Sequence, residues 1–178
     1  MYGQAGFTII ELMIVVAIAA TLAIIAMPYM NDVISNQRIR AAVTEMHLSL
    51  LLARSEAIKR NDDVSIVKTG ANWTDGWTVQ ATDPITTNPI TLQTTDALSD
   101  KITLACNTNS NPTADTCPTS VTFTRTGRPD LTSPVTLIEY RLYESGNPRV
   151  WMRCVSVSLS GRPEIKVDDD SNTANGCD

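Results

Sequence analysis

The hydrophobic residues follow one another along the chain in three patterns. Residues 7–30 are almost wholly apolar, and Glu11 is the only charged residue among them. In residues 39–57 apolar side chains recur at spacings of four and three, which is the period of one helix face. After Asn61 the pattern changes to short β-branched or alternating runs, which are typical of strands. This order predicts an apolar helix, an amphipathic helix and then a β domain.

The apolar segment has the length of a membrane span. As an α-helix its 24 residues extend over about 36 Å, compared with about 30 Å for the hydrocarbon core of a bilayer. A secretory signal peptide would have a basic start, a shorter apolar run and a cleavage site beyond that run. Residues 1–6 contain no Lys or Arg. We therefore expect a transmembrane helix over residues 7–30. Composition does not tell whether this helix is only a single-pass anchor or has a further role.

The amphipathic segment is predicted to be a helix over residues 31–60. Its apolar stripe consists of Ile39, Val43, Met46, Leu50, Ala53 and Ala57. Lys59, Arg60 and Asn61 suit a helix C-terminus, where cations are favoured and Asn tolerates the left-handed conformation. The stripe indicates a helix that packs its apolar face under the β domain. We expect His47, beside the stripe, to be a surface residue or a hydrogen-bonded core residue.

Eight short runs in the rest of the chain are predicted to be strands. They are Val64–Lys68, Trp77–Gln80, Ile90–Leu92, Ile102–Leu104, Val121–Phe123, Thr136–Tyr143, Val150–Leu159 and Glu164–Val167. Because no helices alternate with them, we expect an antiparallel α+β domain over residues 31–178, with its β-sheets in 62–178. The segment Asn107–Thr116 is expected to be an exposed loop.

The four cysteines, Cys106, Cys117, Cys154 and Cys177, favour disulfides over metal binding. They contain no closely spaced pair, and the single histidine lies on another segment, so no metal site is expected. An even number of cysteines in an exported domain indicates two disulfides formed in an oxidising compartment. Three connectivities are open from the sequence alone. Pairing of sequence neighbours favours Cys106–Cys117 and Cys154–Cys177.

Composition and motifs argue against several classes of protein. A hydrophobic fraction of 43% with 19% charged residues indicates a folded chain, and the net charge of −5 disfavours a nucleic-acid surface as the main role. No phosphate-binding loop, nucleophile elbow, HExxH zinc motif or dinucleotide fingerprint is present. We therefore expect neither an enzyme nor a cofactor. The run 168–170 of three aspartates lacks the ligand spacing of a calcium loop and is expected to be a solvated acidic tail.

Glu11 is the most informative residue of the apolar segment. A carboxylate within a membrane-spanning run costs about 3 kcal/mol at the bilayer centre and is usually functional. Gly6 directly precedes Phe7, and Glu11 follows Phe7 by four residues. If the chain were cut between Gly6 and Phe7, the new ammonium would lie at the positive end of the helix dipole. An acid one turn further on would offset that charge in the same chain or in a neighbouring one.

Residues 6–18, GFTIIELMIVVAI, resemble the class III signal of type IV pilins and type II secretion pseudopilins. The resemblance implies a leader peptide at residues 1–6, which prepilin peptidase removes after Gly6 before methylating the amino group of Phe7. It also implies that Glu11 is the assembly glutamate. Pro28 lies where these families carry a helix-weakening residue, so it is expected to be a kink or a hinge. One departure is the absence of Lys and Arg from the leader. We therefore expect either a start upstream of Met1 or an orientation set by other charges, such as Asp32 and Arg38.

Several later segments are similar to the GspH/FimT group, which includes FimU-like minor pilins. They are Trp73–Trp77, Val121–Phe123 leading to Gly127-Arg128, Ser160-Gly161-Arg162, and the helix end ARSEAIKRN. We expect the glycines of the two Gly-Arg pairs to adopt positive φ, and Trp73 and Trp77 to be packing residues.

This resemblance implies two alternative functions. The first is a minor pilin or pseudopilin that primes or joins assembly of a type IV pilus or a type II secretion pseudopilus, at or near the filament tip. The second is a FimT-like minor pilin that binds DNA through Arg128, Arg162 and Lys166 during natural transformation. The structural role is favoured, because Glu164 and the three aspartates follow the last Gly-Arg pair and would weaken phosphate attraction.

The resemblance also implies partners and a location. The expected partners are prepilin peptidase, other minor pilins and the major pilin (or pseudopilins), the inner-membrane assembly machinery, and membrane lipid before assembly. Nucleic acid is a partner only in the second alternative. The chain is expected to cross the bacterial inner membrane once, with its C-terminal domain in the periplasm, and then to enter the filament.

Overall fold

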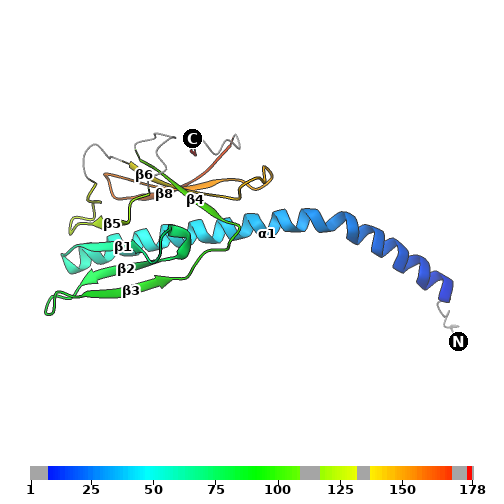
Figure 1. Ribbon diagram of the computed structural model, residues 1–178, viewed down its shortest axis with the longest axis horizontal. Helices are drawn as coiled ribbons and strands as arrows, with labels where there is room; N and C mark the ends of the chain where they lie inside the picture. Colours follow the sequence, from blue (N-terminus) through cyan, green and yellow to red (C-terminus); the bar gives the residue numbers. More distant parts are fainter. Residues whose placement is uncertain (1–7, 109–116, 132–136, 170–175, 178) are drawn as a thin grey trace, which may run out of the picture. The chain divides into compact units, whose positions relative to one another are not determined.

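The computed structural model describes residues 8–108, 117–131, 137–169 and 176–177, and it leaves out the side chains of residues 25–28. The chain forms two compact units, one up to Ile34 and one from Ser35 onward, and each is described by itself. The long helix α1 (Ile9–Arg60) contributes to both units. Figure 1 shows the ribbon coloured along the chain.

The first unit is the apolar start of α1. The backbone N–H of Leu12 donates to the carbonyl of Thr8 at 3.2 Å, which closes the first turn of the helix. Large apolar side chains cover its surface, and Ile9, Ile18 and Ile24 are more than half exposed. No single described helix is long and apolar enough to cross a membrane. The two helical segments Ile9–Ile24 and Tyr29–Arg60, taken together as one bent span, are long and apolar enough by length and composition.

The second unit begins with the amphipathic part of α1. The predicted stripe is confirmed, because each of its six residues is at most 1% exposed: Ile39, Val43, Met46, Leu50, Ala53 and Ala57. Two of these positions are alanines, so the strands can approach the helix backbone closely. The helix ends where Asn61 adopts a φ of 53° and the N–H of Asp62 bonds to the carbonyl of Ala57.

In the described part of the chain, eight strands form two antiparallel four-stranded sheets beside this helix (Figure 1). The first sheet has the order β3-β2-β1-β5 and the second the order β4-β6-β7-β8. The strands are β1 (Val64–Lys68), β2 (Trp77–Thr82), β3 (Pro89–Thr95), β4 (Thr103–Thr108), β5 (Ser120–Phe123), β6 (Leu137–Tyr143), β7 (Arg153–Ser158) and β8 (Pro163–Val167). The predicted α+β fold, a long N-terminal helix packed on antiparallel sheets, is therefore confirmed.

Most strand boundaries differ from the prediction by one to three residues, and the largest differences are at β4 and β7. Asn107, assigned above to a loop, belongs to β4, where it pairs with Glu139 of β6 and is 2% exposed. Strand β7 begins at Arg153 and not at Val150, because the N–H of Val150 bonds within a turn to the carbonyl of Asn147 and that of Trp151 bonds to Asn36 Oδ1. Neither N–H is then available to the sheet.

One core joins the helix to both sheets. A one-turn 3₁₀-helix, η1 (Trp73–Asp75), which the sequence did not predict, places Trp73 edge-on to Tyr140 of β6, with ring centroids 5.2 Å apart. Ser49 Oγ of α1 accepts hydrogen bonds from Trp77 Nε1 of β2 at 3.0 Å and from Gln93 Nε2 of β3 at 3.2 Å. Both tryptophans are at most 2% exposed, so they are packing residues, as predicted.

Candidate functional site

The N-terminal signal is only partly within the described residues. The expected cleavage position at Gly6 and the expected methylation position at Phe7 lie outside them. Glu11 is described in the first turn of α1, where it is exposed and its backbone N–H donates to Thr8 Oγ1 at 3.3 Å. Thr8 and Glu11 have the spacing of a capping box, a signature that the sequence reading above did not use. The observed bond is a cap supplied by the Thr8 side chain, and Glu11 has the position from which the acid of a capping box bonds back to the N-cap N–H.

Pro28 lies inside α1. Its side chain is outside the described set, so the expected kink or hinge at this position stays a prediction.

Both predicted disulfides are present. Cys106 of β4 is bonded to Cys117 with their Cα atoms 4.9 Å apart, and Cys154 of β7 is bonded to Cys177 with their Cα atoms 5.9 Å apart. The second bond ties the C-terminal segment to a central strand of the second sheet, and Lys166 Nζ of β8 also donates to the carbonyl of Cys177 at 3.5 Å.

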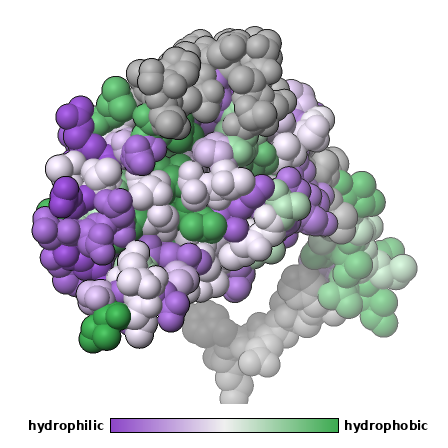
Figure 2. Space-filling model, turned by 60° about the vertical axis from the view of Figure 1, so that its left-hand side comes forward, coloured by the Kyte–Doolittle hydropathy of each residue, from purple (hydrophilic) through white to green (hydrophobic). Residues whose placement is uncertain are grey.

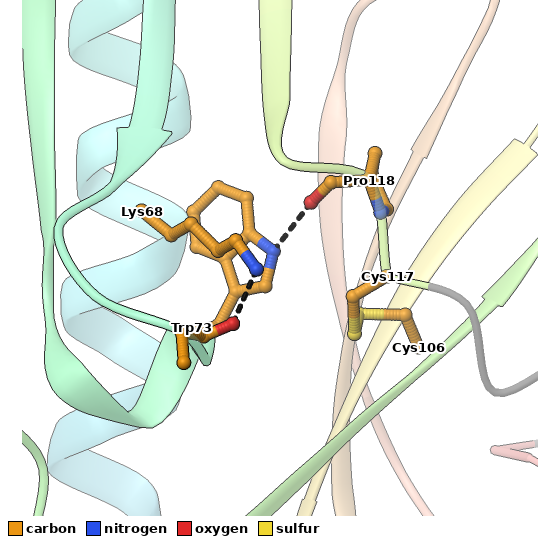
Figure 3. Close-up of a disulfide and its surroundings, with 6 residues drawn as sticks. Lys68, Trp73, Cys106, Cys117 and Pro118 are labelled. Carbon is orange, nitrogen blue, oxygen red and sulfur yellow. Dashed lines mark hydrogen bonds between the residues drawn. A yellow bond between two sulfur atoms is a disulfide. The ribbon is translucent and has the colours of Figure 1, made fainter.

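The first disulfide connects the two sheets through its neighbours (Figure 3). Pro118, next to Cys117, accepts a 2.7 Å hydrogen bond from Trp73 Nε1, and the chain then continues into β5 of the first sheet. Lys68 Nζ beside Trp73 donates to the carbonyl of Ala71. A hollow of about 410 Å³ next to this group is lined from both sheets, by residues that include Lys68 of β1 and Leu104 of β4. Because the Lys68 ammonium already donates to the backbone carbonyl of Ala71, we interpret Lys68 as a structural residue and not as a ligand-binding one.

The two Gly-Arg pairs lie together at one end of the second unit. Gly127 and Gly161 have φ values of +74° and +73°, which confirms the predicted positive φ. A Cβ built on Gly161 would lie 2.0 Å from the carbonyl oxygen of Gly127, so the turn after β7 packs directly on the turn after β5. The exposed Arg128 donates from Nε to the carbonyl of Leu159 at 3.0 Å. The structure thus brings Arg128 close to the exposed Arg162 through backbone contacts.

Lys166 does not join the two arginines. It is four residues beyond Arg162, on β8, which corresponds to about 13 Å along an extended strand. Glu164 lies between them and is exposed. On the face seen in Figure 2, hydrophobic residues emerge as separate spots among hydrophilic ones, so that side of the domain presents no continuous apolar patch.

The expectation of a solvated acidic tail is wrong at its first residue. Asp168 is 1% exposed, and its backbone N–H extends the β7–β8 ladder by bonding to the carbonyl of Met152 at 3.1 Å. The strand pairing therefore carries Asp168 into the fold, whereas Asp169 is exposed and Asp170 lies outside the described residues. His47 is partly buried and lies 3.3 Å from the carbonyl of Pro163, in agreement with a hydrogen-bonded residue.

Comparison with protein families places the chain in a known group. A model described as "Type II transport protein GspH" matches residues 42–161, and one described as "Prokaryotic N-terminal methylation motif" matches residues 1–27. The first match covers more than half of the chain. The chain therefore belongs to the GspH family of type IV pilin-like proteins, a family of structural pilins and pseudopilins.

Solved structures agree with this fold. The type IV minor pilin FimU of Pseudomonas aeruginosa strain PAO1 has a TM-score of 0.57 at 20% identity, over 80% of this chain and 96% of the FimU chain. The minor pseudopilin EpsH, from the type II secretion system of Vibrio cholerae, has a TM-score of 0.51 at 15% identity, over 72% of this chain and 95% of the EpsH chain. At such identities the likeness shows the fold alone.

Two curated proteins have a higher sequence identity to the chain than these structures, but over a shorter stretch. Two curated proteins named "Fimbrial protein", both from Pseudomonas aeruginosa, are 42% identical to the chain over 65 residues. This stretch covers 36% of the chain and 42% of each relative, so the chain matches less than half the length of these relatives.

Proposed function

We propose that this protein is a minor subunit of a type IV pilus or a type II secretion pseudopilus, which primes or joins filament assembly at or near the tip. The observation that carries the proposal is the presence of both family matches in one chain: an N-terminal methylation motif precedes a GspH-type domain. A subunit of this kind combines a helix for the filament with a folded domain for selective contacts.

The proposed sequence of events begins at the membrane. Prepilin peptidase removes residues 1–6 and methylates Phe7, while residues 7–30 hold the chain in the inner membrane and the β domain folds in the periplasm, where its disulfides form. The exposed apolar side chains of residues 9–24 contact lipid first and neighbouring subunits later. Because both surroundings are apolar, packing and charge pairing decide when the helix enters the filament.

Glu11 supplies the charge pairing in this proposal. Its carboxylate lies in the first turn of α1, where it offsets an amino terminus at Phe7 of the same chain or of a neighbour. An unpaired charge within the apolar filament core would be costly, so pairing favours the correct stagger between subunits.

Three phenotypes scored side by side test the proposal. Deletion of the gene should reduce pilus number or exoprotein secretion, and the affected phenotype identifies the filament. Re-expression of the chain should restore that phenotype. If pili and secretion are unchanged and only transformation is lost, the structural role is wrong.

DNA binding remains a second candidate, and the proximity of the two Gly-Arg turns favours it. Arg128 and Arg162 are both exposed there. However, Glu164 and Asp169 follow nearby and the net charge is −5, so a structural subunit should bind duplex DNA weakly and lose that binding at physiological salt. Sub-micromolar binding at physiological salt, lost in Arg162→Glu with the fold intact, would favour the DNA-uptake role instead.

A further inference from the structure

The segment that leads into β7 holds an exposed tryptophan against the part of α1 with which the second unit begins. We call residues 147–151 the Trp151 loop. Trp151 is 49% exposed, whereas the other two tryptophans of the chain are buried in the core. The backbone N–H of Trp151 donates to Asn36 Oδ1 at 3.2 Å, and Asn36 Nδ2 donates to the carbonyl of Arg149 at 3.4 Å. The loop is therefore fixed to the helix with its tryptophan at the surface.

The point of attachment of the Trp151 loop is close along the chain to the apolar segment. Asn36 follows Met30, the end of that segment, by six residues of α1, which corresponds to about 9 Å of helix. Even a fully extended chain would hold Asn36 within about 20 Å of Met30. The headgroup layer of a bilayer extends about 5–7 Å beyond the hydrocarbon core on each side. If residues 7–30 cross a bilayer, the loop is therefore kept near its surface whichever way the second unit is turned.

Three arginines lie near this attachment point. Arg38 and Arg40 are exposed on α1, and side chains on a helix lean toward its N-terminus, which here is the direction of the apolar segment. Burial and the nearby positive charge of Arg40 lower the pKa of the Arg153 guanidinium at the start of β7. Within the described residues, no ion pair joins any of the three arginines to an acid. Neighbouring cations without an anion favour the binding of phosphate or carboxylate groups.

The acids of this region offset these arginines only in part. Glu144 and Asp168 line a hollow of about 260 Å³ together with residues of the Trp151 loop, and Asp168 is 1% exposed. Asp169 is exposed and Asp32 is half-buried, but the loop adds a further cation, Arg149. The surface around Trp151 therefore has an excess of arginine, on a protein whose net charge is −5.

We propose that Trp151 and these arginines form an interfacial anchor, by which the second unit binds the anionic phospholipid surface of the bilayer that holds its own helix. The indole enters the headgroup layer, where tryptophan is favoured because its ring is apolar and its N–H is polar. The guanidinium groups of Arg38, Arg40 and Arg153 bind lipid phosphates. The inference rests on the proposed function for the membrane-inserted state, and entry into a filament releases these contacts.

A bilayer fits this surface better than its other possible occupants. A polyanion in solution, such as duplex DNA, pairs with arginines but offers no apolar layer to the indole. A neighbouring subunit requires an encounter, whereas the chain's own bilayer lies within reach of the Trp151 loop as soon as residues 7–30 are inserted. The combination of an exposed tryptophan with arginines is also typical of membrane interfaces.

Tryptophan fluorescence of the full chain, inserted as one copy per lipid nanodisc, tests this inference. The discs contain phosphatidylglycerol, and part of their lipid carries bromine near the headgroup to quench adjacent indoles. Trp151 should be quenched by the brominated lipid and shielded from acrylamide. Trp151→Phe should remove both effects, because Trp73 and Trp77 are at most 2% exposed. Arg38→Gln with Arg40→Gln should lower the ratio of lipid-bound to free Trp151 about 25-fold, at about fivefold for each arginine near an anionic surface.

Arg125→Gln is the matched control, because Arg125 is an exposed arginine far from the Trp151 loop. It lies two residues before Gly127, whose added Cβ would meet Ile58 near the end of α1. Ile58 follows Arg38 by 20 residues, or about 30 Å of helix. The control variant should leave the quenching of Trp151 unchanged.

Four results would each overturn the inference. They are an unquenched Trp151, equal quenching in discs of neutral lipid, an equal effect of Arg125→Gln, and release of Trp151 from lipid by duplex DNA at physiological salt. Shielding of Trp151 in sheared filaments but not in discs would assign the surface to a protein neighbour instead. The proposed function fails separately, if deletion of the gene has no phenotype, and it stands if Trp151 is unquenched while the wild-type chain restores the deletion phenotype.

Discussion

At Gly161 the backbone comes so close to Gly127 that no side chain fits between the two turns. The positive φ of both glycines was predictable from the Gly-Arg pattern, but their contact was not, because 34 residues separate them in the sequence. A Cβ on Gly127 would also lie 2.6 Å from Ile58 Cδ1 at the end of α1. The paired turns therefore join the two sheets and the helix end, and this packing explains why glycine stands at both positions.

Gly161→Ala should lower the free energy of unfolding by about 3 kcal/mol or more, because it adds a left-handed alanine and an overlap with the Gly127 carbonyl. Gly146→Ala is the matched control: Gly146 has a φ of +79°, but its added Cβ would have no atom within 4 Å. The control should lose only about 1–2 kcal/mol. Urea unfolding measures both variants, and equal losses would contradict the importance of the close approach.

Ser49→Ala tests the polar link inside the core. The change leaves the buried Trp77 Nε1 and the partly buried Gln93 Nε2 without their shared acceptor, so unfolding free energy should fall by about 1–3 kcal/mol. Ser55→Ala, on the exposed side of the same helix, should change it by no more than about 0.5 kcal/mol. If the two variants unfold alike, Ser49 does not act through these hydrogen bonds.

At the scale of elements, periodicity was sufficient to predict α1 and the existence of all eight strands. A helix stripe or a run of β-branched residues is a local signal, so each element could be recognised from its own residues. The 3₁₀ turn at Trp73, the extension of β4 to Thr108 and the burial of Asp168 were missed. Each depends on a partner distant in sequence: Tyr140, β6 and Met152 respectively.

The second disulfide joins Cys154 of β7 to Cys177 in the C-terminal segment, two parts of the chain that are far apart in the sequence. Cys154→Ala with Cys177→Ala removes a link that closes a loop over a sequence separation of 23 residues, and it should lower stability by about 3 kcal/mol. Chemical unfolding of the oxidised protein and of the double variant measures the difference. An unchanged midpoint would show that β8 and its contacts hold the C-terminal segment without the bond.

At the scale of the whole molecule, the two units present different surfaces. The first exposes apolar side chains along the start of α1, whereas the second encloses its apolar residues between the helix and two sheets. The sequence predicted this division from the long apolar run and its near lack of charge, because Glu11 is the only charge before Asp32. For Glu11 the structure adds an alternative, because Thr8 caps the helix through the Glu11 backbone N–H and Glu11 has the position of the acid in a capping box.

Glu11→Gln separates these two roles of the residue. A glutamine can still serve the capping box but carries no charge, so in the proposed function Glu11→Gln and Glu11→Ala should both insert into the membrane and both enter filaments poorly. Quantitative immunoblotting of membrane and sheared filament fractions measures this partition. Normal incorporation of the glutamine variant alone would mean that capping, and not charge, is what the residue provides.

The central claim is that the chain is processed as a pilin and becomes part of a filament. Mass spectrometry of the purified filament fraction tests it most directly, because the mature N-terminus and the presence in the filament are read from the same peptides. The account predicts a chain that begins at Phe7 with a methylated amino group. A filament fraction without this chain, or a chain that retains residues before Phe7 or is cut beyond the apolar segment, would contradict it.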